Sequence, residues 1–253
     1  MATAAEPNTP IPIICADSST VVGAEVFDPN SWSSNSKAIV QSCWTEYSVL
    51  NHCVEQLDKM CSEAERICKA QIATLQQQWA TAKFDLGKVV IFATQPDLHM
   101  RIEAFFSGVK SLLDLLVQLL PSEGIVSGGI DGFHRSQNVY GGTVLNTLRN
   151  NAPNSRKELA AKVEALISEH KASWIDQAIN ARDQLIHPKK GMHQLMFHLD
   201  FVESEGKLVC KKVSPPDIDS VPINQYAQRV LKHAQSFTSA FLALLREAAD
   251  AER

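Results

Sequence analysis

The most constraining feature of this sequence is the stretch from Ser36 to Asp85, which contains neither glycine nor proline. Within it, apolar residues recur in alternating steps of four and three, the period of one face of an α-helix. These residues are Cys43, Tyr47, Leu50, Val54, Leu57, Cys61, Ala64 and Cys68, followed by Ile72, Leu75 and Trp79. The pattern predicts one long helix over most of 37–84. Because small residues alternate with leucine, packing within the same chain is favoured over a free coiled coil.

A second helix is expected to begin at Pro96, since proline suits the first turn of a helix, and to stop at Pro121. Its apolar face is wide, which predicts that it is the most buried helix. The segment 121–142 that follows holds six of the eleven glycines. No strand leads into it and no GxxxxGK motif follows, so a flexible connector is favoured over a phosphate-binding loop. A short helix is expected at 143–150.

Ser155 and Glu158 have the spacing of a capping box, in which two side chains satisfy backbone donors at a helix start. This start predicts one helix, or two closely spaced helices with a break near 168–173. The helical segment is expected to end before Pro188, because the residue preceding a proline is disfavoured in α conformation. The last helix is expected to begin near Pro222.

The only strand-like alternation lies at about 193–213, where two apolar–polar runs flank a turn and predict a hairpin. The expected fold class is therefore all-α, a helical bundle of about five main helices with one appended β-hairpin. Residues 1–35, which hold four of the eleven prolines, are expected to form an irregular arm, and 36–253 a single domain.

Composition narrows the class of protein. The net charge of −4 argues against a general nucleic-acid coat protein, and the six cysteines include no CxxC pair, which favours buried thiols in a reducing compartment. No secretory signal is visible, and the apolar run Leu112–Leu120 is short and broken by Asp114. We expect a soluble cytoplasmic protein without membrane contact. His193 and His198 match no metal-site spacing, and neither a metal nor a cofactor is predicted.

Arg182 is the most informative single residue. Positions Ala178, Ile179, Leu185 and Ile186 surround it at helical spacing, so its guanidinium starts on an apolar face. A charged group on such a face needs a partner, because leaving it dry and unpaired is costly. Arg182 is therefore expected to form either a structural ion pair or an anion site.

Arg182 is followed by Asp183 and, after three more residues, by His187 and Pro188. An arginine and a histidine at this spacing occur about once by chance in such a chain, so the context carries the signal. With that context, Arg182, Asp183 and His187 resemble the signature of the HEPN superfamily (higher eukaryotes and prokaryotes nucleotide-binding domains). The resemblance implies a helical bundle, often dimeric, and in many members a ribonuclease. Toxin-type members often carry a tyrosine two residues after the histidine, but Lys189 stands there.

The three residues suit metal-independent RNA cleavage. Arg182 can hold a phosphate bidentately and stabilise the charge that develops on it. His187 can transfer the proton of a ribose 2′-hydroxyl or of the leaving 5′-oxygen, and Asp183, four residues earlier, can orient its ring. One histidine cannot easily take the 2′-hydroxyl proton and also give a proton to the 5′-oxygen. The resemblance implies a dimer, in which the other protomer would supply a second histidine. We therefore expect a homodimer whose interface includes Arg182.

Basic residues near the motif are candidates for contacts with the RNA backbone, although a solvated hairpin surface is the simpler interpretation. They are Lys189, Lys190, Lys211 and Lys212. The leading hypothesis is a metal-independent endoribonuclease acting on single-stranded RNA in a defence or toxin–antitoxin context, with an antitoxin-like protein partner. The alternatives are a catalytically silent module that binds a nucleotide, RNA or a protein through the same groove, and a purely structural interaction protein. In a structural role, Arg182 would pair with Asp183 or with an acid on a neighbouring helix.

Overall fold

The computed structural model describes residues 32–79, 96–186, 197–205 and 207–250. The helices are α1 (Ser34–Trp79), α2 (Pro96–Ser122), α3 (Gly142–Asn151), α4 (Lys157–His170), α5 (Asp176–Ile186) and α6 (Ile223–Asp250), with a 3₁₀ turn η4 (Asn154–Arg156) and a π-helix η5 (Lys171–Ile175). The strands are β1 (His198–Ser204), β2 (Lys207–Ser214), β3 (Asp217–Ile218) and β4 (Val221–Pro222). The predicted class, a helical bundle with an appended hairpin, is confirmed.

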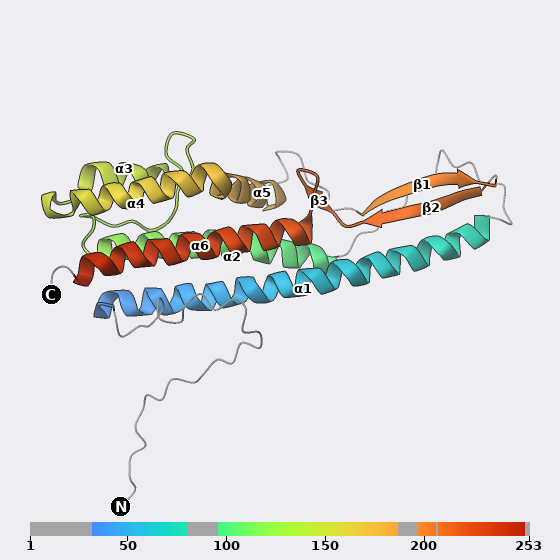
Figure 1. The fold of residues 1–253 in the computed structure, drawn as a ribbon, viewed down its shortest axis with the longest axis horizontal. Helices are drawn as coiled ribbons and strands as arrows, with labels where there is room; N and C mark the ends of the chain where they lie inside the picture. Colours follow the sequence, from blue (N-terminus) through green and yellow to red (C-terminus); the bar gives the residue numbers. More distant parts are fainter. Residues whose placement is uncertain (1–31, 80–95, 187–196, 206, 251–253) are drawn as a thin grey trace, which may run out of the picture.

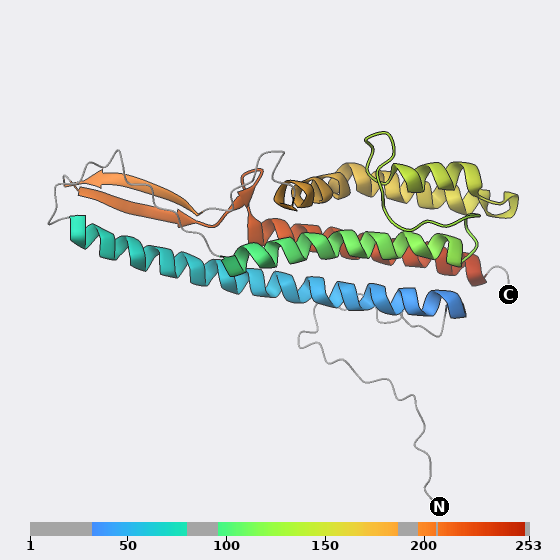
Figure 2. The ribbon, with the colours of Figure 1, turned by 180° about the vertical axis from the view of Figure 1, so that it is seen from behind.

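The helices form layers. Figure 1 shows α1 running beside α2 and α6, with α3, α4 and α5 on the other side of α2 and α6. Helix α1 has 46 residues and is therefore about 70 Å long at 1.5 Å per residue. Its C-terminal half continues beyond the bundle, and the hairpin β1–β2 packs along that extension through β2, as the reverse view in Figure 2 also shows.

The four-three pattern of α1 is confirmed as its buried face. All its members from Cys43 to Ile72 are buried, and Leu50 and Leu57 have no exposed surface. Four of the cysteines on this helix are buried free thiols, as expected. Burial raises the pKa of Cys43 to about 12 and that of Cys61 to about 11, because it disfavours the thiolate.

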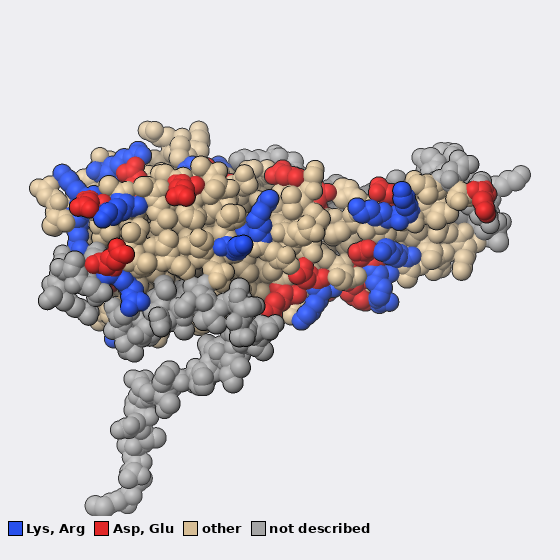
Figure 3. Space-filling view, viewed as in Figure 1, with Lys and Arg blue, Asp and Glu red and all other residues tan. Residues whose placement is uncertain are grey.

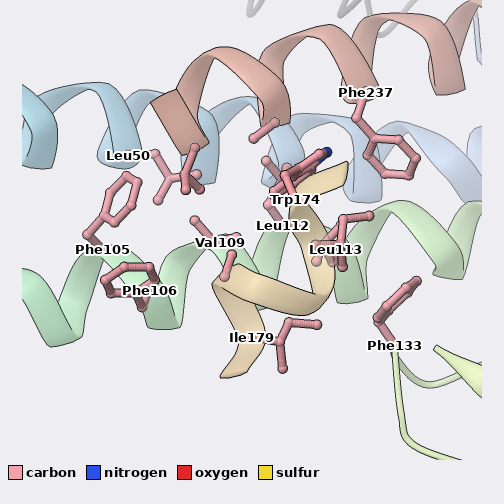
Figure 4. Packing of buried hydrophobic residues seen from close by; sticks show 14 of the residues in the cluster. Leu50, Phe105, Phe106, Val109, Leu112, Leu113, Phe133, Trp174, Ile179 and Phe237 are labelled. Atoms are coloured by element: carbon pink, nitrogen blue, oxygen red, sulfur yellow. The ribbon is translucent and has the colours of Figure 1, made fainter. Parts of the chain in front are cut away.

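Helix α2 is the central helix. Its predicted apolar face is buried throughout, and Figure 4 shows its side chains between those of α1 and the η5–α5 segment. Among the described helices, α2 alone has the length and hydropathy of a membrane span, with a window of mean hydropathy 1.3. More than half of that window is buried inside the bundle, so the apolar surface of α2 serves the protein core.

Three details differ from the sequence predictions. The prediction of a capping box is wrong, because α4 begins at Lys157 without a side-chain cap and Ser155 belongs to the preceding 3₁₀ turn η4. Pro121 does not stop α2, which includes it in its last turn and ends at Ser122. The break expected near 168–173 is the π-helix η5, which joins α4 to α5 without interrupting the helical path.

The hairpin is antiparallel, with a register shift between Asp200 and Phe201. Its strands occupy most of the predicted 193–213, of which 193–196 lie outside the described residues. On one face Phe197 and Val213 are buried, while on the other Val202 and Val209 pair across the strands and are exposed. One face of the hairpin is thus covered and the other free, as the alternating pattern implies.

Candidate functional site

Helix α5 packs on α2 and carries Arg182 and Asp183, the two residues of the predicted motif that the structure describes. Ala178, Ile179 and Leu185 are buried there, in agreement with the predicted apolar face. Arg182 lies at the margin of this face with a side chain 28% exposed, and its Nε is buried. The guanidinium is therefore half-buried at the edge of the core.

The Asp183 carboxylate is the centre of a cluster of cationic and polar donors. Its Oδ1 accepts a hydrogen bond from Nη1 of Arg182 at 3.1 Å. Its Oδ2 accepts one from Nη2 of Arg135 at 3.2 Å and one from the Tyr140 hydroxyl at 3.0 Å. Arg135 and Tyr140, which precede Asp183 by 48 and 43 residues, therefore converge with the adjacent Arg182 on one carboxylate that is only 17% exposed. We call Arg135, Tyr140, Arg182 and Asp183 the arginine cluster.

A tight turn brings Arg135 and Tyr140 together. Ser136 and Val139 exchange two backbone hydrogen bonds, and the residues between them, Gln137 and Asn138, both have positive φ (50° and 66°). This is a two-residue hairpin turn of type I′. It sets Arg135 opposite Tyr140, so the guanidinium lies 3.8 Å from the centre of the tyrosine ring and also hydrogen-bonds its hydroxyl.

The loop that carries this turn is fixed to helix α2. The backbone N–H of Phe133 donates to Oδ1 of Asp114 at 2.6 Å, and Asp114 also pairs with Lys110. The Phe133 ring is buried beside Leu113 (Figure 4). Gly141 has φ +65°, and a Cβ there would lie 2.3 Å from the Phe133 ring, so only glycine fits. The expectation of a loose connector at 121–142 is corrected, because this part of it is packed on the bundle.

The charges of the arginine cluster do not balance. Two guanidinium groups carry two positive charges, and the single carboxylate carries one negative charge, so the cluster has a net charge of about +1. The buried Nε–H of Arg182 has no hydrogen-bond partner among the described residues. A buried donor without an acceptor is unfavourable, and an anion would satisfy it. The arrangement can therefore bind a phosphate or a carboxylate.

The predicted site residues fall into three groups. Arg182 and Asp183 are side by side, whereas His187, Lys189 and Lys190 lie outside the described residues. Lys211 and Lys212 are exposed on β2, in the hairpin that extends beyond the bundle along α1, and the structure does not bring them to the arginine cluster. Acidic and basic groups are mixed around this extension in Figure 3. In the strand register, Lys212 lies opposite Asp200.

Arg135 and Tyr140 are the residues that the sequence prediction missed. The local signal was Gln137-Asn138, because asparagine tolerates the left-handed conformation that a type I′ turn requires. Within the described residues, no group of three His, Cys, Asp or Glu side chains is arranged to hold a metal ion.

Comparison with known proteins gives no match: no family model, no curated protein and no solved structure is similar to this chain.

Proposed function

We propose that this protein is a metal-independent endoribonuclease of the HEPN type, acting on single-stranded RNA, and that the arginine cluster is the phosphate-binding half of its site. The observation that supports the proposal is the convergence of Arg135 and Arg182 on one carboxylate, which leaves one positive charge and one buried donor unmatched. The last residue of the cluster, Asp183, precedes His187 by four residues in the sequence, so the proposed proton-transferring group follows soon after it.

The proposed reaction is an internal transfer. The ribose 2′-oxygen attacks the neighbouring phosphorus, the bond from phosphorus to the 5′-oxygen breaks, and a 2′,3′-cyclic phosphate and a 5′-hydroxyl form. One base takes the 2′-hydroxyl proton and one acid gives a proton to the 5′-oxygen. His187 serves one of these roles, and His187 of a second protomer serves the other in a homodimer. Arg182, with Arg135, stabilises the charge that builds up on the phosphate oxygens.

A second candidate function is binding without cleavage. Asp183 already accepts three hydrogen bonds, out of the roughly four lone-pair sites of a carboxylate. It is therefore largely committed to holding the two arginines and the tyrosine, and has little capacity left to orient an imidazole. A module that binds nucleotide or RNA phosphate through the arginines needs no such orientation.

Cleavage of a 5′-labelled single-stranded RNA in EDTA tests the proposal. We expect the wild type to leave a 2′,3′-cyclic phosphate or its hydrolysis product. Arg182→Ala should slow the reaction by about 10² to 10³, the usual effect of removing one charge-stabilising donor, and His187→Ala by about 10² to 10⁴.

Lys162→Ala is the matched control, since Lys162 lies on α4 and pairs with exposed Glu158. Its cleavage rate should equal that of the wild type. If the wild type does not cleave, but binds an uncleavable 2′-O-methyl RNA in a way that depends on Arg182, the binding module is correct. Cleavage by Arg182→Ala at the wild-type rate refutes the ribonuclease proposal.

A further inference from the structure

A second polar pocket lies between the π-helix and α6, and it is lined by residues outside the arginine cluster. In η5, Trp174 is buried, and its Nε1 donates to Nδ1 of His170 at 3.0 Å. A π-helical turn inserts one extra residue into a helix, and such insertions are frequent at functional sites. Here it brings Ser173 and Trp174 to face α6.

The pocket has a volume of about 220 Å³. The lining residues are Ser173, Trp174, Gln177, Tyr226, Arg229, Val230 and His233. We call it the α6 pocket. Its size is below the roughly 300 Å³ of the smallest pockets for drug-sized molecules, so it suits a small group.

The walls of the α6 pocket are held in place by aromatic contacts. The His233 ring lies nearly parallel to Trp174, at 10° and 6.3 Å between centroids. The Arg229 guanidinium lies 5.2 Å from the centre of the Tyr226 ring, whose side chain is only 1% exposed. The imidazole and the guanidinium lie four residues apart on α6, so both line the pocket from the same helix face.

The side chains that line the α6 pocket are cationic or uncharged, while the carboxylate of Asp219, outside the lining, also acts on Tyr226. Arg229, Lys232 and His233 fall within two turns of α6, and neither Arg229 nor Lys232 forms an ion pair within the described part of the chain. No carboxylate lines the pocket. Figure 3 shows basic atoms in the middle of the face that α6 presents, set apart from acidic ones.

The charged groups that act most strongly on the pKa of His233 are basic. Burial, followed by Arg229 and Lys232, lowers the pKa of His233. From the opposite element, His170 adds a further basic group, and Glu169 acts on the pKa of His170. Glu55 on α1 shares a neighbouring groove with Lys232 but does not pair with it.

We propose that the α6 pocket binds a phosphate group, with the Arg229 guanidinium and the His233 imidazole as its principal donors. A phosphate fits because the pocket offers a guanidinium, an imidazole, an amide and a hydroxyl, and no carboxylate is among its lining residues. The phosphate belongs either to a free mononucleotide or to an RNA strand. The site is separate from the arginine cluster and does not depend on ribonuclease activity.

The experiment follows the His233 ring resonance by NMR in the full-length protein, with the signal assigned by its loss in His233→Gln. Inorganic phosphate, 5′-AMP and a short 2′-O-methyl RNA are added separately at an ionic strength matched with potassium chloride. A bound phosphate stabilises the imidazolium, so the pKa of His233 should rise by about one unit. Arg229→Gln should weaken the binding about tenfold, because a hydrogen bond to a charged partner is lost. Lys37→Gln, which removes the same charge from the far end of α1, should bind as the wild type does.

If phosphate and 5′-AMP raise the pKa of His233, the pocket binds a free nucleotide. If RNA alone raises it, the pocket binds the phosphate of an RNA strand. If none of the three probes moves the pKa of His233 beyond the effect of potassium chloride, the proposal is wrong. It is equally wrong if Arg229→Gln, with an unchanged circular dichroism spectrum, binds as tightly as the wild type.

Discussion

Asp114 is expected to hold the loop that carries Arg135 and Tyr140. Its Oδ1 accepts the Phe133 N–H at 2.6 Å, and the same carboxylate pairs with Lys110 at 2.5 Å. A hydrogen bond to a charged group contributes about 1.5–3 kcal/mol, and a half-exposed ion pair adds up to about 1 kcal/mol. Asp114→Ala should therefore lower the free energy of unfolding by about 3 kcal/mol.

Thermal unfolding measures this loss, since 1 kcal/mol corresponds to roughly 2–4 °C in Tm for a chain of this size, so the expected shift is about 6–12 °C. The matched control is Asp131→Ala in the same loop, because the Asp131 side chain is 90% exposed and pairs with His134, itself half-exposed. Its effect should stay within about 0.5 kcal/mol. If the two variants unfold alike, the loop is not anchored through Asp114, and the position of Arg135 needs another explanation.

Three further predictions concern the core and its titratable groups. Phe106→Ala should cost about 3–5 kcal/mol in urea unfolding, whereas exposed Met100→Ala should cost almost nothing; equal costs would contradict the packing. Because burial raises the pKa of Cys43 to about 12, iodoacetamide at pH 8 should label Cys210 first and Cys43 only after unfolding. Burial also lowers the pKa of His170 below its usual 6.5, so the unfolded chain takes up the proton first. Stability should therefore fall as the pH drops below about 6.5, and His170→Gln should reduce that slope.

The fold was largely predictable because its signals are local. Helices α1 and α2 each bury one continuous face, and the sequence spacing of apolar residues such as Leu50, Leu57 and Ile102 predicts that face. The hairpin was predictable for the same reason, since residues alternate between its two faces.

Sequence patterns gave a wrong prediction where the same residues suit two local conformations. Ser155 has the spacing of a capping box with Glu158, yet it enters η4, and Glu158 pairs with Lys162 instead. The sequence offered a break near 168–173 as an alternative but did not show that it is a π-helix, because one inserted residue changes which side chains face the core only over a single turn.

The candidate site was half predictable. Arg182 stood out as a charge on an apolar face, and Asp183 follows it directly. The partners of Asp183 come from a loop more than 40 residues earlier, and their position depends on a type I′ turn and on the Phe133–Asp114 anchor. Such long-range contacts have no periodicity in the sequence.

The central claim is that Arg135 and Arg182 act on one phosphate, and a double-mutant cycle tests it most directly. The affinity for an uncleavable 2′-O-methyl RNA is measured for the wild type, Arg135→Ala, Arg182→Ala and the double variant. Residues that share a ligand are non-additive by about 0.5–3 kcal/mol, so the second substitution should weaken binding far less than the first. Strictly additive losses, or an affinity that neither substitution changes, would contradict the account.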